Sequence, residues 1–177
     1  MQEESLFYCA HLIQSQQLTR ILEIGTGYGI WSITMALSDP KVTITTVELN
    51  RQRVNIAREN IRALGLSDRI TVIEGDALTI PLEGLYDLIL IDGPKSQNQP
   101  LFEKCWPLMK PSGYILIDNL DFHGETDADH GTQSASLRQM VRKINDFKAR
   151  IQNRSDLNVL NLQIGDGLML VSRKYQR

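Results

Sequence analysis

The sequence is short of cysteine and of long apolar runs, and each shortage excludes a class of protein. Its two cysteines, Cys9 and Cys105, are not spaced as metal ligands and give no disulfide framework, so we expect reduced thiols in a cytoplasmic protein. No apolar run approaches the roughly 20 residues that cross a bilayer. Residues 1–17 lack the basic start and cleavage site of a signal peptide, so no membrane partner is expected. The three histidines show no zinc-like spacing.

Net charge is low as well, at −2, but the charges are unevenly distributed. Residues 138–177 contain nine Lys and Arg against three Asp, a balance of +6, whereas the remainder has ten basic and eighteen acidic residues, a balance of −8. A basic end on an acidic body is typical of a protein with an anionic partner. A solvated helix face accounts for the same pattern, and the sequence leaves both interpretations open.

Apolar runs alternate with helical patterns, which predicts an α/β fold with a mostly parallel sheet and helices on both faces. The length suits a single domain, residues 1–177. The seven expected strands are 20–24, 42–47, 70–73, 88–91, 114–117, 157–164 and 168–172. The last two form an antiparallel hairpin around Gly165, Asp166 and Gly167.

Helices are predicted between these strands. One follows the first strand as far as Ser38, and another buries one apolar stripe before Gly65 ends it. That stripe consists of Val54, Ala57, Ile61 and Leu64. Further helices are expected within 1–19, near 99–109 and along 137–151. Residues 119–136 are rich in loop-forming residues, and we expect a loop near the active site there, because loops of that length are often functional.

A glycine-rich turn follows the first predicted strand. Gly25, Gly27 and Gly29 allow backbone angles closed to other residues and let a ligand approach the main chain, at the start of a helix that favours negative charge. Glu48 ends the second strand, 23 residues after Gly25, where an acidic residue commonly binds a ribose diol. Ile30 stands where the dinucleotide motif has its third glycine, which argues against a pyrophosphate and for S-adenosylmethionine (SAM).

Polar residues end the fourth and fifth predicted strands. Asp92 ends the fourth, and Asp118 and Asn119 end the fifth. Because open α/β sheets bind ligands outside the carboxyl ends of their strands, near the point where strand order reverses, we expect these three oxygen donors to converge beside the cofactor. Such donors suit Mg²⁺, and Lys95 lies within reach. The pattern predicts metal-assisted group transfer, although single strand-end aspartates also occur in ordinary turns.

Several ordered segments resemble the motifs of class I SAM-dependent methyltransferases. They are residues 22–29 (LEIGTGYG), 47–48 (VE), 75–77 (GDA), 86–92 (YDLILID) and 111–114 (PSGY). Residues 92–95 (DGPK), 118–119 (DN) and 164–167 (IGDG) narrow the resemblance to the metal-dependent, catechol-type O-methyltransferase family. The resemblance covers nearly the whole chain and implies a single-domain Rossmann-like fold.

The resemblance also implies a set of cofactor-binding residues. They are Glu23, Gly25, Thr26, Gly27, Gly29, Glu48, Asp76, Ala77 and Asp92. Glu48 would bind the ribose hydroxyls and Asp76 the adenine edge, although a capping role explains Asp76 as well. Family members usually carry a serine, which contacts the methionine carboxylate, where this chain has Trp31, so Ser32 or the main chain would have to supply that contact.

For the reaction, the resemblance implies Asp92, Asp118 and Asn119 as ligands of Mg²⁺ or another divalent cation. Lys95 would be the general base that takes the acceptor's hydroxyl proton, with Asp92 beside it. A metal favours the oxyanion of a coordinated hydroxyl, and methyl transfer is then an in-line displacement. An ordinary exposed loop lysine would give the same sequence at Lys95.

The resemblance leaves two kinds of acceptor open. Family members methylate catechols and related vicinal diols, and one bacterial branch methylates 5-hydroxyuridine at a tRNA wobble position. Both acceptors offer two adjacent oxygens to a metal. The basic stretch 138–154 favours tRNA, whereas the modest overall charge and the lack of an evident aromatic stacking platform favour a small catechol-like molecule. We predict tRNA, with the small molecule as the alternative.

Only 19 residues precede the first predicted strand, so the acceptor pocket is expected to be open or completed by a second subunit in a homodimer. Two other classes of protein remain open. A nicotinamide-dependent oxidoreductase would use the same glycine turn, but it would leave Asp118 and Asn119 without a purpose. A non-catalytic SAM-binding protein would bind the cofactor without any dependence on metal.

Overall fold

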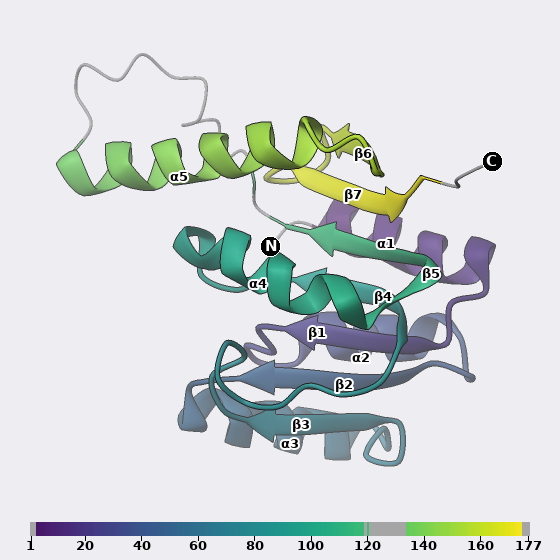
Figure 1. The fold of residues 1–177 in the computed structure, drawn as a ribbon. Helices are drawn as coiled ribbons and strands as arrows, with labels where there is room; N and C mark the ends of the chain where they lie inside the picture. Colours follow the sequence, from purple (N-terminus) through teal and green to yellow (C-terminus); the bar gives the residue numbers. More distant parts are fainter. Residues whose placement is uncertain (1–2, 119, 121–133, 175–177) are drawn as a thin grey trace.

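The structure, a computed structural model, describes residues 3–118, 120 and 134–174. Within these residues, seven strands form one sheet in the order β3-β2-β1-β4-β5-β7-β6 (Figure 1). The strands are β1 (Arg20–Ile24), β2 (Thr43–Glu48), β3 (Ile70–Glu74), β4 (Tyr86–Ile91), β5 (Met109–Ile117), β6 (Leu157–Leu162) and β7 (Leu168–Arg173). The first five are parallel, and the β5–β7 and β7–β6 pairs are antiparallel. The predicted fold class is therefore confirmed.

Strand order reverses beside β1. From β1 the chain builds outward through β2 to β3, and it then returns to add β4 on the other side of β1. All five parallel strands end at one edge of the sheet, so the segments that follow them face a common region. Open α/β sheets bind their ligands at that edge, beside the reversal.

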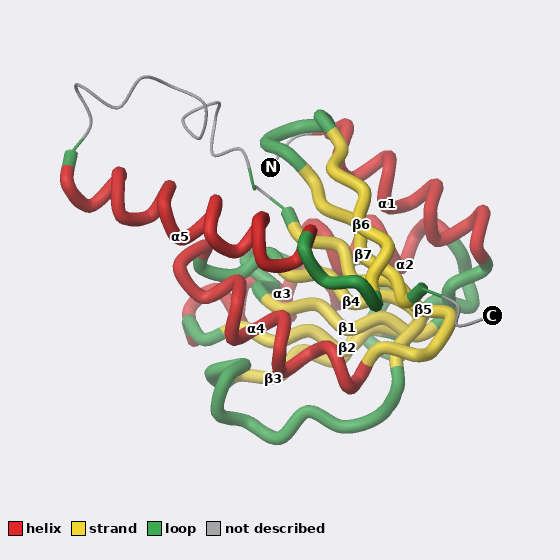
Figure 2. The backbone as a smooth tube through the Cα atoms, turned by 45° about the horizontal axis from the view of Figure 1, so that its top comes forward, coloured by secondary structure: helices red, strands yellow, loops and turns green. Residues whose placement is uncertain are grey.

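Helices cover both faces of the sheet. The helices are α1 (Glu3–Gln16), α2 (Ile30–Ser38), α3 (Arg51–Ala63), α4 (Asn98–Cys105) and α5 (Ala135–Gln152), with short 3₁₀ turns η1 (Lys95–Gln97) and η2 (Trp106–Leu108). In Figure 1, α1, α2 and α3 lie behind the sheet, and α4 and α5 lie in front of it. Figure 2 shows α1 and α5 on opposite sides of the strands.

Strand β4 shows why the predicted runs are apolar at every position. Leu88 and Leu90 pack in the cluster that contains residues of α1 and α2, and Ile89 and Ile91 pack in the cluster on the α4 and α5 face. All four side chains are fully buried. Because successive side chains of a strand point to opposite faces, a strand covered on both faces must be apolar throughout. Burial of each such side chain contributes about 1.5–3 kcal/mol.

One predicted core residue, Leu64, lies on the surface instead. Helix α3 ends at Ala63, and Leu64 is 54% exposed. The backbone turns out of the helix at Gly65, whose φ is +68°, and the N–H of Gly65 donates to Arg62 O at 3.0 Å. Leu66, which is 4% exposed, takes the core position that Leu64 was expected to fill. Helical spacing therefore predicts burial only within the helix, and Leu64 lies just beyond its end.

Helix α5 begins inside the range that was expected to be a loop, residues 119–136. Ser134 is its N-cap, and the Ser134 hydroxyl accepts a hydrogen bond from the N–H of Leu137 at 3.3 Å. Residues 119 and 121–133 lie outside the described residues, so the loop and its place near the active site stay a prediction.

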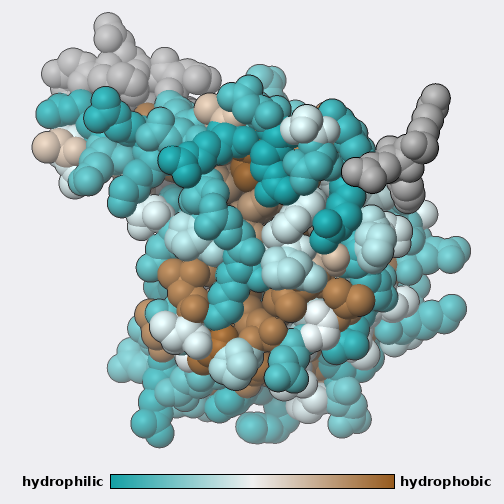
Figure 3. Space-filling view, in the orientation of Figure 1, coloured by the Kyte–Doolittle hydropathy of each residue, from teal (hydrophilic) through white to brown (hydrophobic). Residues whose placement is uncertain are grey.

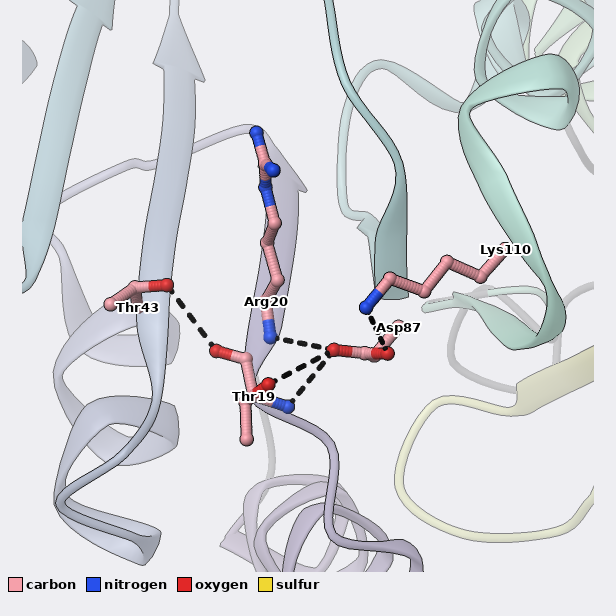
Figure 4. Close-up of polar contacts among 5 residues, drawn as sticks. All are labelled: Thr19, Arg20, Thr43, Asp87 and Lys110. Atoms are coloured by element: carbon pink, nitrogen blue, oxygen red, sulfur yellow. Dashed lines mark hydrogen bonds and ion pairs between the residues drawn. The ribbon is translucent and has the colours of Figure 1, made fainter.

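At the amino-terminal edge of the sheet, Asp87 ties neighbouring strands together (Figure 4). Its Oδ2 accepts hydrogen bonds from the N–H groups of Thr19 and Arg20 at 3.2 and 2.9 Å, and its Oδ1 pairs with Lys110 Nζ at 2.7 Å. Burial raises the pKa of Asp87, but the bonds from Lys110, Arg20 and Thr19 outweigh it, so the pKa lies below its ordinary value. This carboxylate is held by protein donors and has a structural role.

Candidate active site at the carboxyl edge of the sheet

The glycine turn after β1 brings two loops into contact. Gly25 has φ +101°, and its N–H donates to Val47 O at 2.9 Å. A Cβ at this position would lie 2.3 Å from the main-chain oxygen of Asp92. Because that separation is far below van der Waals contact and φ is in the left-handed region, only glycine fits. The turn thus joins the end of β1 to the end of β4.

Glu48, at the end of β2, is fixed by the main chain on both sides. One carboxylate oxygen accepts the N–H of Gly27 at 2.9 Å, and the other accepts the N–H of Asn50 at 2.8 Å. The side chain is 8% exposed. Each oxygen keeps a second lone pair, so a carboxylate held in this way can also accept hydrogen bonds from a ligand's hydroxyl groups.

A hollow of about 560 Å³ lies at the ends of β1 to β4. Five of the predicted cofactor residues line it, namely Gly25, Glu48, Asp76, Ala77 and Asp92. Its volume is within the range of roughly 300–1,000 Å³ found for small-molecule sites. The Asp76 carboxylate accepts the N–H of Leu78 at 2.9 Å, so Asp76 also caps its own turn.

The other four predicted cofactor residues, Glu23, Thr26, Gly27 and Gly29, do not line this hollow. Gly27 holds Glu48 in place, whereas Gly29 precedes α2, and a Cβ added to it would pack 3.5 Å from Ala57 of α3. Thr26 is 3% exposed, and its hydroxyl shares a hydrogen bond of 2.6 Å with that of Thr46. The contact of these four residues with a cofactor stays a prediction.

Glu23 is an acid inside the core of the sheet. Its side chain is fully buried and accepts a hydrogen bond from the Ser32 hydroxyl. The pKa of Glu23 is raised to about 7, mainly by burial; the bonds from Ser32 and Thr46 oppose this rise, and the charges of Asp92 and Glu48 add to it. The carboxyl therefore takes up a proton near neutral pH.

The structure also locates Trp31, where the resemblance left a contact unassigned. Trp31 is 1% exposed and packs in the core cluster shared with α1. Ser32 is fully buried, with its hydroxyl directed to Glu23. Neither side chain lines the hollow. Among the described residues, no side chain caps the start of α2, so main-chain N–H groups are the donors that this helix offers to a ligand.

Lys95 lies between the ends of β4 and β5. Its Nζ donates to Asp92 Oδ1 at 3.1 Å and to the main-chain oxygen of Asp118 at 3.1 Å. The two strands pair up to Ile91 and Ile117, and the N–H of Asp118 donates to Ile91 O at 3.1 Å. The structure thus places Lys95 between the Asp92 carboxylate and the main chain of Asp118, and the roles of these residues as base and metal ligands stay predictions. Asn119 lies outside the described residues.

Sequence reasoning missed part of the lining of the hollow. Leu49, Asn50 and Arg53 line it beside Glu48, and Gln97 and Leu101 line the side formed by η1 and α4. Asn50 carried a signal, because an asparagine before a helical stripe is a typical N-cap, and its side chain accepts the N–H groups of Gln52 and Arg53. No pattern marks Gln97, which reaches the hollow through the path of η1.

In the described part of the chain, no three His, Cys, Asp or Glu side chains gather as metal ligands. The predicted ligand set has two aspartates and one asparagine, and the asparagine is not described. None of the described helices is both long and apolar enough to cross a bilayer. Cys9 and Cys105 are both free and buried, and burial raises the pKa of Cys105 to about 12.

Comparisons with known proteins place the chain in a family. Caffeoyl-CoA O-methyltransferase 1 of Nicotiana tabacum is 29% identical over 180 residues, which cover 94% of this chain and 74% of that protein. Catechol O-methyltransferase of Mycobacterium tuberculosis is 32% identical over 147 residues, which cover 78% of this chain and 66% of that protein. Both relatives carry O-methyltransferase names.

Solved structures similar to this chain also carry O-methyltransferase names. A Staphylococcus aureus protein provisionally named a caffeoyl-CoA O-methyltransferase has a TM-score of 0.93 at 29% identity, over 98% of this chain and 85% of that one. An O-methyltransferase from Bacillus cereus, solved with S-adenosylhomocysteine (SAH), has a TM-score of 0.84 at 27% identity, over 98% and 82%. The sequence model of the O-methyltransferase family matches residues 2–174. With almost its whole length covered by that match, the chain belongs to the O-methyltransferase family and is a SAM-dependent enzyme.

Proposed function

We propose that this enzyme transfers the methyl group of SAM to a hydroxyl of an acceptor that presents two adjacent oxygens to a divalent cation. The observation that carries the proposal is the position of Asp92. It lines the cofactor hollow and also pairs with Lys95, which contacts Asp118. The methyl donor and the group that would handle the acceptor's proton therefore meet at one carboxylate.

The predicted ligand set fits a hard cation. Asp92 and Asp118 directly follow the paired residues Ile91 and Ile117 of adjacent parallel strands, so their backbones are neighbours. Together with Asn119 they offer carboxylate and amide oxygens, which Mg²⁺ prefers to the nitrogen and sulfur ligands that suit zinc. When bound, such a cation would lower the pKa of an acceptor hydroxyl and hold the two acceptor oxygens.

The chain's own residues would then position the reactants and move one proton. Lys95, anchored by Asp92 and the main chain of Asp118, is placed to accept the hydroxyl proton at Nζ once it is itself deprotonated. The new bond forms from the acceptor oxygen to the methyl carbon while the carbon–sulfur bond breaks, and the electron pair stays on sulfur. Alignment of oxygen, carbon and sulfur by Glu48 and the glycine turn supplies the main rate advantage.

For the acceptor we propose 5-hydroxyuridine in tRNA. Helix α5 carries five Lys and Arg against one Asp within Ala135–Gln152, and phosphate contacts require such a surface. The alternative is a small catechol-like molecule, which the names of the tobacco and mycobacterial relatives favour. Caffeoyl-CoA has a catechol ring and also phosphates, so it shares features with both candidates.

The decisive experiment measures transfer of labelled methyl from SAM to bulk tRNA that lacks this modification, with Mg²⁺ and with a chelator. We expect labelling that maps to a hydroxylated wobble uridine, disappears with the chelator and is lost in Asp118→Ala. Asp68→Ala, which removes an exposed aspartate just before the amino end of β3, at the edge of the sheet opposite the site, is the matched control and should keep full activity.

A negative result with tRNA would identify the alternative rather than leave the question open. Catechol and caffeoyl-CoA are assayed in parallel under the same conditions. Chelator-sensitive labelling of either one without labelling of tRNA would replace tRNA with a small molecule. Equal labelling with and without the chelator would overturn the role of the metal.

A further inference from the structure

A second hollow opens beside Lys95. It has a volume of about 240 Å³ and lies between the start of α4 and helix α5. Lys95, Ser96 and Gln99 form one wall, and Lys143, Asp146 and Arg150 form the other, with Phe147 at the base. We call this hollow the α5 groove. Lys95 lines both the groove and the cofactor hollow, so the two sites are neighbours.

Charge in the α5 groove is positive. Lys143 and Arg150 are exposed, and among the described residues neither forms an ion pair. Lys95 already donates to Asp92 and Asp118, so its charge is partly committed. Asp146 opposes the two α5 cations, and the balance of the α5 wall is one positive charge. In Figure 3 the surface over α5, at the upper left, is mostly hydrophilic.

Helix geometry explains why the two cations share one wall. Lys143 and Arg150 are seven residues apart, close to two full turns, so their side chains project from the same side of α5. Ile144, Phe147 and Ile151 are buried against the sheet, which keeps this side of the helix next to η1 and α4. The groove is therefore built by the packing of η1, α4 and α5, whose lining side chains all belong to the described residues.

The volume limits what the α5 groove can hold. Sites for whole drug-sized ligands are roughly 300–1,000 Å³, so about 240 Å³ fits only a part of an acceptor. Two cationic side chains and two neutral polar ones, Ser96 and Gln99, suit a tetrahedral anion with several acceptor oxygens. A free catechol carries no such group.

We propose that the α5 groove binds a phosphate group of the acceptor, through Lys143 and Arg150, while the acceptor's hydroxyl lies at Lys95. The groove can bind part of the acceptor only if the acceptor is methylated beside Lys95, so this inference rests on the proposed function. An RNA backbone phosphate and a phosphate of coenzyme A present the same chemistry. In either case the groove selects phosphate-bearing acceptors over free catechols.

Direct binding tests the α5 groove without relying on catalysis. Two probes are titrated against the full-length enzyme loaded with SAH, namely a fluorescent anticodon stem-loop RNA and coenzyme A. The variant is Lys143→Ala/Arg150→Ala. The control is Lys41→Ala/Arg62→Ala, which removes the same charge from exposed residues elsewhere. Thermal unfolding of both variants verifies that they remain folded.

We expect the groove variant to bind at least one probe about tenfold more weakly, because each cation makes a charge-assisted contact, and the control to change it less than about twofold. For RNA, the slope of log Kd against log salt should fall by about 1.4–1.8, the amount for two lost phosphate contacts. Asp146→Asn should tighten the same probe. A loss confined to RNA identifies the RNA backbone as the source of the phosphate, and a loss confined to coenzyme A identifies a phosphate of coenzyme A.

Unchanged binding of both probes by the groove variant would overturn the phosphate site, and so would equal weakening by the control. Failure of the proposed function looks different. In that case wild-type enzyme would transfer no methyl group to tRNA, caffeoyl-CoA or catechol, whatever the groove variant does to probe binding. Where transfer occurs, the groove variant should raise KM for the phosphate-bearing acceptor with kcat retained, and leave KM for free catechol unchanged.

Discussion

An aspartate lies at each end of strand β4 and pairs with a lysine from another element, and the two pairs differ in what surrounds them. At the amino end, Asp87 accepts main-chain and hydroxyl hydrogen bonds and pairs with Lys110 at 2.7 Å (Figure 4). At the carboxyl end, Asp92 pairs with Lys95 at 3.1 Å and lines a hollow large enough for a cofactor. The same two residue types are thus structural at one edge of the sheet, and we propose that they are catalytic at the other.

Strand direction explains the difference. Parallel strands all point their carboxyl ends at one edge, where loops diverge around the reversal in strand order and leave space. At the opposite edge the amino ends of β1 and β4 adjoin, so protein groups saturate Asp87. An Asp–Lys pair by itself therefore predicts little, and its position along the strand decides its role.

The largest effect should come from replacing each of the two lysines, Lys95 and Lys110, by alanine. We expect Lys95→Ala to lower kcat by about 10²–10⁴, the usual contribution of a general base, with SAM affinity retained. Lys110→Ala should keep kcat and lower the unfolding temperature. Methyl-transfer kinetics, calorimetric SAM titration and thermal unfolding measure these quantities. Equal loss of kcat in both variants would abolish the distinction between the two ends.

The second effect concerns the close approach that shapes the carboxyl edge. Gly25→Ala should destabilise the fold by about 2–5 kcal/mol, because the added Cβ meets the main-chain oxygen of Asp92 at 2.3 Å and φ is +101°. Gly27 has φ +54°, and a Cβ added to it would meet nothing within 4 Å, so Gly27→Ala should lower the free energy of unfolding by only about 1 kcal/mol. Urea unfolding compares the two, and similar losses would show that the contact with Asp92 is unimportant.

The third effect is a pH dependence of stability at the buried acid Glu23. Glu23 has its pKa raised to about 7 by burial, so the folded state binds a proton that the unfolded state releases near pH 4.5. Stability should therefore fall by roughly 3 kcal/mol as the pH rises from about 4.5 to 7. Glu23→Gln should remove this fall. The unfolding free energy of both proteins is measured against pH. Parallel profiles for the wild type and the Glu23→Gln variant would contradict this assignment.

The fourth effect is the loss of the structural pair. Asp87→Asn should lower the unfolding free energy by about 2 kcal/mol at neutral pH, since hydrogen bonds to a charged acceptor are lost. The pKa of Asp87 is lowered, so its contribution is present above the ordinary value and disappears as the pH falls through the folded-state pKa. Wild type and variant should therefore converge in acid. A drop in SAM affinity in this variant would mean that the two edges are coupled.

The smallest effect should be at Glu48. Glu48→Gln keeps the size of the side chain but removes a charge that accepts the N–H groups of Gly27 and Asn50. We expect SAM to bind about tenfold more weakly, as the loss of one charge-assisted contact gives. Calorimetric titration measures the affinity, and Glu74→Gln, at the exposed end of β3, is the matched control. If the Glu48→Gln variant binds SAM as tightly as the wild type, Glu48 does not contact the cofactor.

Much of the fold could be predicted from single segments. The strand at residues 20–24 and the hairpin near the C-terminus were predicted almost to the residue, since apolar runs and turn glycines are local signals. Leu64 was predicted wrongly, because its helix ends one residue earlier. Asp92, Lys95 and Asp118 were predicted to meet because strand ends share an edge, which is a rule of topology rather than of distance.

Other features have no local signal. Gln97 lines the hollow only because η1 turns it there, and the α5 groove exists only because α5 packs beside α4. Spacing along the chain could not reveal that Thr26 bonds to Thr46 and that Gly29 lies against Ala57 of α3. The side on which a turn residue lies depends on its neighbours in space.

The sequence by itself determined the α/β architecture, the family and the residue types at the carboxyl edge, because alternating apolar runs and short motifs are encoded within a few residues of one another. Only the tertiary structure decided which carboxylate is saturated by protein donors and which lines a hollow, and which cations stand beside Lys95. Those outcomes depend on burial and on contacts between segments 20 to 100 residues apart, such as Asp87 with Thr19, 68 residues away. Burial and long-range contact are properties of the packed chain, so no local pattern carries them.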